Sequence, residues 1–152
     1  MVEKTPSNQE LARSLLAAGG AASLATLDAV GGPFASYVVT APAADGAPLM
    51  LLSDLAEHAR NLKRDARASL LFVREPAAEE ERMTALRLTL TGRATKDGDP
   101  ADLARYVERH PDSERYAGFS DFSLYRFEIS GGHLVAGFGR IVDLTPAKLL
   151  GT

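Results

Sequence analysis

The sequence predicts a mainly β protein, an antiparallel β-barrel of six to seven strands with flanking helices. Three observations lead to this class. Short apolar segments recur along the chain with turn residues between them, several of them alternate apolar and polar residues, and few helical segments interrupt them. Short strands with short connections are typical of antiparallel barrels. The 152 residues, 45% of them hydrophobic, suffice for one domain with its own core.

The N-terminal third predicts a helix followed by three strands. Ser7 is a suitable N-cap for a helix that runs to Ala18, because Glu10 follows it by three residues. Gly19-Gly20 ends this helix. Turn residues then separate three apolar segments, which we interpret as a meander of strands. These strands are Ala22 to Asp28, Phe34 to Ala41 and Leu49 to Ser53.

The central third predicts a second helix between strands. Asp54 and Glu57 form a capping-box pattern for a helix that ends at Arg64. An apolar run, an acidic segment that contains a proline, and a segment of strict alternation follow it. We interpret these as a buried strand at Ser69 to Val73, a solvated loop at Glu75 to Met83 and a half-buried strand at Leu86 to Thr95.

The C-terminal third predicts a helix and a hairpin. Asp99 as cap and Pro100 at the first helical position predict a helix that runs to about Arg109. Two further strands, Ser123 to Ile129 and His133 to Phe138, would pair across the turn Ser130-Gly-Gly132. We expect a single domain over 1–152, with an N-terminal helix in 1–20 and a tail over 141–152.

Composition excludes several classes of function. The net charge of −3 gives no electrostatic case for nucleic acid, whose binding proteins usually carry a basic face. The absence of cysteine excludes disulfides and thiolate metal sites. No uninterrupted apolar run reaches membrane-spanning length, and the first residues lack the cationic region of a signal peptide. We therefore expect a cytoplasmic protein that binds neither nucleic acid nor membrane.

The segment Leu51 to Phe72 is the most informative part of the chain. It combines a strand end, a short helix and a buried strand, and it places Ser53, His58, Arg60 and Asn61 within a few helical turns. Free backbone N–H groups and the positive end of a helix dipole favour an anion, and cationic side chains strengthen the preference. The segment therefore predicts a site for a phosphate ester.

Other motifs do not point to chemistry. The three histidines have no metal-ligand spacing, so we expect no metal site. We expect His110 to contact the end of a helix and His133 to lie on an exposed strand face. Gly137-Phe-Gly139 lacks the third glycine and the strand–turn–helix context of a dinucleotide fingerprint. No Gly-x-Ser-x-Gly elbow is present.

Four segments taken together resemble the FMN-binding split β-barrel family typified by pyridoxamine 5'-phosphate oxidase, and more narrowly its haem-utilisation branch. The match runs from about Leu11 to Asp143. The segments are Gly32-Pro-Phe-Ala-Ser-Tyr-Val-Val-Thr40, Leu51 to Phe72, Leu86-Arg-Leu-Thr-Leu-Thr-Gly-Arg-Ala94 and Val135-Ala-Gly-Phe-Gly-Arg140. Their order and spacing are more specific than any one of them.

The resemblance implies a split antiparallel β-barrel that forms a homodimer with FMN at the subunit interface. In that family one strand runs along the flavin, a strand end and the following helix hold the phosphate, and the other subunit contributes a side chain near the ring. The corresponding residues here are Ser36, Tyr37, Val38 and Thr40 in the strand, Leu52, Ser53, His58, Arg60 and Asn61 at the phosphate, and Arg87 from the other subunit.

The function implied is that of an FMN-dependent oxidoreductase acting on an unidentified small-molecule substrate. The flavin would carry the chemistry, so we name no catalytic residue of the protein. Where the oxidase has a lysine at the end of its flavin strand, this chain has Ala41, and it contains no tryptophan. The resemblance thus does not extend to vitamin B6 phosphate oxidation.

Two alternatives stay open. One is a haem-binding or haem-degrading protein on the same barrel. In some haem-degrading relatives the axial histidine lies close to the C-terminus, whereas the last histidine here is His133. The other alternative is a cofactor-free binding module. Addition of FMN or haem would distinguish the three, because a ligand that binds only the native state raises its stability.

Overall fold

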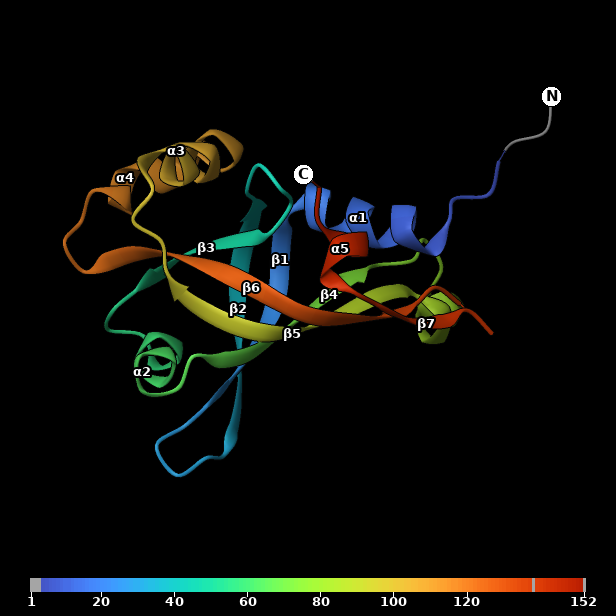
Figure 1. Ribbon diagram of the computed structural model, residues 1–152, viewed down its shortest axis with the longest axis horizontal. Coiled ribbons are helices and arrows are strands. Elements are labelled where there is room, and N and C mark those ends of the chain that lie inside the picture. The colour runs from blue at the N-terminus through green and yellow to red at the C-terminus, as the bar shows by residue number, and fades with distance from the viewer. Residues whose placement is uncertain (1–3, 138, 152) are drawn as a thin grey trace.

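The computed structural model describes residues 4–137 and 139–151, which form a closed six-stranded antiparallel barrel with one additional strand (Figure 1). The strand order is β3-β2-β1-β4-β5-β6-β7, and pairing of β3 with β6 closes the barrel. The strands are β1 Gly20–Leu27, β2 Pro33–Pro42, β3 Pro48–Ser53, β4 Arg67–Arg74, β5 Leu86–Lys96, β6 Phe122–Val135 and β7 Ile141–Leu144. The predicted fold class is confirmed.

Short helices flank the barrel (Figure 1). Two predicted caps are confirmed, because the Glu10 N–H donates to Ser7 Oγ (3.1 Å) and the Ala101 N–H donates to Asp99 Oδ1 (2.9 Å). The α-helices are α1 Asn8–Ala18, α2 Glu57–Arg64, α3 Pro100–Arg109, α4 Glu114–Ala117 and α5 Pro146–Leu149, and the 3-10 helices are η1 Glu79–Thr84 and η2 Pro111–Ser113. None of the helices in the described ranges has the length and apolar character needed to span a membrane.

Alternation of side chains along the strands produces the core. In β5, Leu88 and Leu90 point inward and are fully buried, while Arg87 and Thr89 point outward. Phe127 of β6 is also fully buried in the same core. The apolar side of α1 packs on this core as well, through Ala12, Leu15 and Leu16. The interior of the barrel is therefore filled by side chains.

The predicted C-terminal hairpin is wrong. Ser130-Gly-Gly132 is not a turn but lies inside the continuous strand β6, and the hairpin joins β6 to β7. Beside these glycines the register of β5 with β6 shifts between Thr91 and Gly92, and Leu149 of α5 packs closely on Gly132. A Cβ added at Gly132 would lie 2.8 Å from Leu149 Cδ1. Phe138, predicted to end the hairpin, lies outside the described residues.

Three smaller predictions also need correction. Asp54 does not cap α2, whose N-cap is Ala56 without a side-chain bond; instead Asp54 lies 3.5 Å from Lys96 Nζ. The acidic segment predicted as a loop contains the helical turns of η1, and the predicted tail contains β7 and α5. β7 forms because it pairs with β6, and this pairing cannot be predicted from the local sequence.

One wall of the barrel presents several large apolar side chains to solvent. Cross-strand pairing aligns two rows of outward-pointing residues, and we call these rows the outer sheet face. The first row is Tyr37, Ser23, Leu71, Thr89, His133 and Asp143, and the second is Val73, Arg87, Val135 and Ile141. Tyr37, Leu71, Val73 and Ile141 are exposed despite their size.

Candidate functional site

A hydrogen bond between Ser36 of β2 and His58 of α2 lies at the corner predicted to hold a phosphate. His58 Nδ1 is 2.9 Å from Ser36 Oγ, which also lies 3.4 Å from the Leu24 carbonyl oxygen. The hydroxyl has one proton, which it can donate either to Nδ1 or to the Leu24 carbonyl, so this contact is compatible with either tautomer of the neutral ring. Burial lowers the pKa of His58, which favours this neutral ring.

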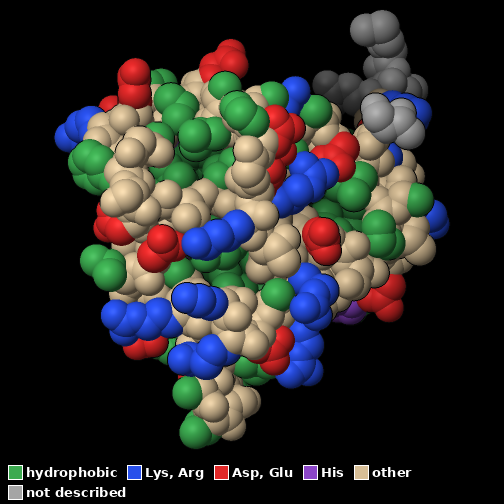
Figure 2. All heavy atoms as spheres, turned by 60° about the vertical axis from the view of Figure 1, so that its left-hand side comes forward, with side chains coloured by type: hydrophobic (Ala, Val, Ile, Leu, Met, Phe, Trp, Pro, Cys, Tyr) green, Lys and Arg blue, Asp and Glu red, His purple; other side chains and the backbone are tan. Residues whose placement is uncertain are grey.

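The other exposed groups of this corner have local partners. Ser53 Oγ accepts from the Leu55 N–H (3.2 Å), which is a turn contact. Arg60 lies 3.5 Å from Glu57 and both side chains are 55% exposed; such a pair is weak and leaves Arg60 able to move to a ligand. Figure 2 shows Lys and Arg side chains distributed among acidic ones on this end of the molecule. The corner is therefore mildly cationic and not a preformed anion hole.

Several predicted site residues have their side chains inside the protein. Val38 and Leu52 belong to the core, and Thr40 donates to the Gly20 carbonyl (3.1 Å). Asn61 is fully buried; its amide nitrogen donates to Thr26 Oγ1 (3.0 Å) and its oxygen accepts from Arg64 (2.6 Å). The side chain of Asn61 thus fixes α2 to β1, so a ligand at the surface would not reach it.

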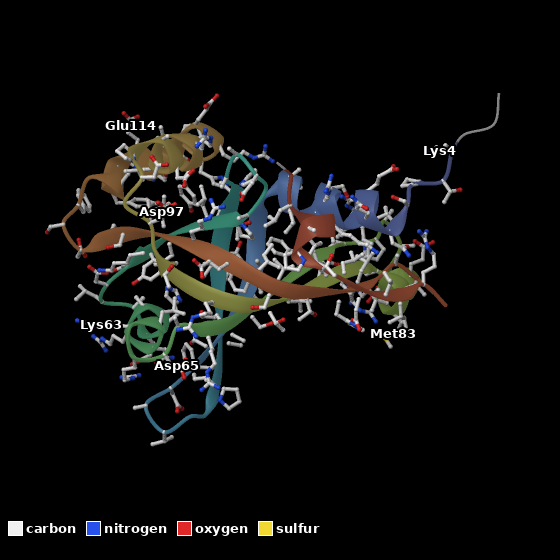
Figure 3. All side chains as sticks on the ribbon, in the orientation of Figure 1. Lys4, Lys63, Asp65, Met83, Asp97 and Glu114 are labelled. Carbon is white, nitrogen blue, oxygen red and sulfur yellow. The ribbon has the colours of Figure 1, made fainter. Side chains whose placement is uncertain are left out.

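The structure does not bring Arg87 to this corner. Strands β1 and β4 lie between β2 and β5, so the two sites are about 14 Å apart across the sheet at the usual strand spacing. Arg87 is also displaced along the strand direction, because the residue of β5 level with Ser36 is Leu90. Figure 3 shows Met83, whose carbonyl accepts from Arg87 (3.0 Å), and Lys63 of α2 at opposite ends of the molecule. Arg87 and Ser36 could approach one ligand only if a second subunit supplied one of them.

A second histidine site was missed from the sequence. His133 Nδ1 lies 2.7 Å from Asp143 Oδ1, and both side chains are on the outer sheet face. The pair borders a cavity of about 280 Å³, whose wall consists of Thr89, Thr91, Gly131, Gly132, His133, Asp143 and Leu144. The sequence predicts the hairpin at Ser130-Gly-Gly132, which leaves Asp143 in the tail. Only the pairing of β6 with β7 shows that Asp143 lies beside His133.

The third histidine is structural. His110 ends α3, and its Nε2 lies 2.7 Å from the Thr40 carbonyl oxygen. A carbonyl only accepts, so Nε2 carries the proton and has no lone pair for a metal. The prediction that His110 contacts a helix end is confirmed, since it is the C-cap residue. Among the described residues, no group of three or more metal-ligating side chains is found.

A closed six-stranded antiparallel barrel with a seventh strand and flanking helices defines a split-barrel protein, and comparison with known proteins specifies the group. The model of the family described as CREG, beta-barrel, matches residues 4–149. The chain therefore belongs to the CREG-like split β-barrel family. Its relatives confirm the predicted resemblance to the haem-utilisation branch of the FMN-binding split-barrel fold.

Three relatives illustrate the group. The chloroplast haem oxygenase HOZ of Arabidopsis thaliana is 36% identical over 110 residues, 70% of this chain and 33% of that protein. The haem oxygenase HutZ of Vibrio cholerae is 29% identical over 133 residues, 84% of this chain and 75% of HutZ. A solved haem-binding protein from Mycobacterium smegmatis is 34% identical, with a TM-score of 0.86 over 97% of this chain and 61% of that protein.

The relatives differ in length from this chain. It spans about a third of the plant protein and less than two thirds of the mycobacterial one. These relatives are named for haem binding or haem oxygenation, and none of the three is named for FMN. The comparisons thus favour the haem alternative over the FMN interpretation that the sequence placed first.

Proposed function

We propose that this protein binds haem. The observation that carries the proposal is the similarity along nearly the whole chain to a haem-binding protein, at 34% identity and a TM-score of 0.86. Two haem oxygenases among the relatives support the same ligand. FMN remains the second candidate, supported by the Ser36–His58 corner at the start of an eight-residue helix.

The residues present fit haem. Iron in haem proteins needs an axial donor, and a neutral imidazole with an unprotonated nitrogen is a common one. At His133 the Nδ1 atom faces the Asp143 carboxylate, which leaves Nε2 of the neutral ring as the donor atom. The outer sheet face offers apolar surface for a porphyrin, and Arg87 offers the planar donor group that suits a propionate.

Haem would supply an iron centre that binds and activates oxygen. The contributions of the protein are positional. Leu71 and Val73 would exclude water from one side of the ring, and the Arg87 guanidinium, held by the Met83 and Ala85 carbonyls, would fix a propionate. We extend the proposal to haem degradation because two relatives carry that activity in their names.

We also propose that two copies associate through the outer sheet face, with the ligand between them. Exposed apolar side chains that lie next to one another on one face mark interaction surfaces. Tyr37 is 74% exposed and Ile141 63% exposed on this face. A second copy docked on this face would remove these side chains from water, which is favourable.

Titration of the purified protein with haemin and with FMN tests the ligand. We expect a Soret band that saturates at one haem per chain, and a rise in melting temperature that reflects about 2.7 kcal/mol of stabilisation at a hundredfold excess over Kd. If the protein binds FMN and not haem, the proposed ligand is wrong and FMN takes its place. Binding of neither would leave a cofactor-free module.

Degradation is measured separately. The haemin complex is incubated with ascorbate in air, and catalase is added to remove peroxide. We expect the Soret band to decay while absorption of an open-chain product grows. A complex whose Soret band is stable under these conditions would retain haem binding and contradict the proposed degradation.

A further inference from the structure

We infer that His133, oriented by Asp143, is the axial ligand of haem iron in this protein. The inference rests on the proposed function and names the residue that would bind the haem iron. It also places the porphyrin against the outer sheet face, over β5, β6 and β7, and away from the corner formed by Ser36 and His58.

The hydrogen bond to Asp143 favours one orientation of the His133 ring, between side chains that are 52% and 87% exposed. The side chains pair across β6 and β7, with Nδ1 2.7 Å from the carboxylate oxygen. An ionised carboxylate only accepts, so Nδ1 carries the proton and Nε2 of the neutral ring holds the lone pair. Metal-binding histidines are oriented in this way by a carboxylate, which also raises their basicity. The pair therefore has the arrangement of a metal ligand and its supporting acid.

The surface around His133 suits a flat apolar ring. Val135 lies two residues along on the same face of β6, and Ile141, 63% exposed, pairs with Val135. Across β5, Leu71 and Val73 continue this apolar area. These neighbours give a porphyrin a surface from which water can be displaced at favourable free energy.

A cationic side chain lies on the same sheet face as His133. Arg87 pairs with Val135, and Thr89 pairs with His133, so Arg87 and His133 are diagonal neighbours on adjacent strands. Diagonal neighbours on one sheet face are about 7–8 Å apart. Arg87 would therefore be available to hold a propionate of a porphyrin bound at His133. One ligand can contact both groups within one subunit.

Space beside the imidazole comes from a glycine. Gly131 lies on the same face as His133 and pairs with Thr91. A Cβ added at Gly131 would meet only Thr91 Oγ1, at 3.8 Å, within a 4 Å radius. The missing side chain contributes to the cavity of about 280 Å³. A larger side chain at position 131 would therefore occupy part of this cavity.

His58 is the weaker candidate. Its Nδ1 is bonded to a neutral hydroxyl and not to a carboxylate, and Ser36 faces the same side of β2 as the buried Val38. The histidine is partly buried where β2 meets α2, and β1 and β4 separate this corner from Arg87. A ring bound through His58 would therefore not contact Arg87 of the same subunit.

The test compares haemin complexes of the wild type, His133→Ala, Asp143→Asn and His58→Ala. We expect His133→Ala to lower haem affinity at least tenfold, to shift the Soret band and to abolish the iron–histidine stretching band of the ferrous complex. Added imidazole should restore the wild-type spectrum. Asp143→Asn should keep the iron–histidine band but at a lower frequency, because an amide oxygen accepts a weaker hydrogen bond from Nδ1 than a carboxylate does. His58→Ala should match the wild type.

A second variant tests the location without removing a ligand. Gly131→Leu should fold with an unchanged circular dichroism spectrum and bind haem at least tenfold more weakly, since its side chain occupies part of the cavity. If His133→Ala keeps the wild-type spectrum and affinity, or if His58→Ala produces the losses instead, the assignment is wrong although haem binding stands. Absence of haem binding by the wild type contradicts the proposed function itself.

Discussion

The Ser36 hydroxyl lies 2.9 Å from Nδ1 of His58, and this hydrogen bond joins strand β2 to helix α2. His58 is partly buried, and burial lowers its pKa from the ordinary value of 6.5. The imidazole of His58 is therefore harder to protonate in the folded protein than in the unfolded chain. This difference in pKa makes the free energy of unfolding depend on pH.

This difference predicts the direction of the pH dependence. Between the lowered pKa of folded His58 and about pH 6.5, the unfolded chain binds more protons than the native one. The free energy of unfolding should therefore be highest above this window and fall as the pH decreases through it. Urea denaturation at several pH values measures it. His58→Gln should show a smaller fall than the wild type; equal slopes would contradict the prediction.

The buried amide of Asn61 should matter for stability and not for ligand binding. Asn61→Ala removes the partner of Thr26 Oγ1 inside the protein, and an unsatisfied buried polar group costs about 1–3 kcal/mol. Arg60→Ala, one residue earlier and exposed, should change stability by less than about 0.5 kcal/mol. Chemical denaturation of both variants checks this. Equal losses would show that Asn61 is not the structural anchor of α2.

Two glycines on the adjacent strands β5 and β6 should differ in their tolerance of alanine. A Cβ at Gly92 would lie 1.9 Å from the Glu128 carbonyl oxygen, whereas one at Gly131 meets no atom closer than 3.8 Å. Gly92→Ala must displace backbone at the bulge and should cost about 3 kcal/mol or more. Gly131→Ala should cost less than about 1 kcal/mol. Thermal denaturation of the pair measures the difference, and a tolerated Gly92→Ala would argue against this register.

A charge on the outer sheet face should prevent association. Leu71 lies in the middle of this face, so Leu71→Arg should convert a dimer into a species of 16.2 kDa because a cation would be buried unpaired between the copies. Leu55→Arg is the matched control, since Leu55 is 69% exposed before α2 and outside this face. Sedimentation velocity gives the masses. A wild-type monomer at all concentrations would refute the proposed dimer.

Sequence alone determined the class of fold, because barrel strands carry their own periodicity. Leu86 to Thr95 alternates with the period of two that a half-buried strand requires, and β5 covers this segment. Ser7 and Asp99 cap their helices as predicted because a cap bonds N–H groups only two or three residues away. The family resemblance could also be seen in the sequence, because it depends on the order and spacing of local segments.

The tertiary structure alone decided which distant residues meet. Glycines at 131 and 132 suit a turn and a strand interior equally, and only packing against Leu149 and pairing with β5 place them in the strand. Asn61 is predicted from the sequence to lie at a phosphate, whereas burial beside Thr26 gives it a structural role. The pairing of β6 with β7 brought Asp143 to His133. Local pattern records what a residue prefers over a few neighbours, whereas strand register and burial depend on contacts that are distant in the chain.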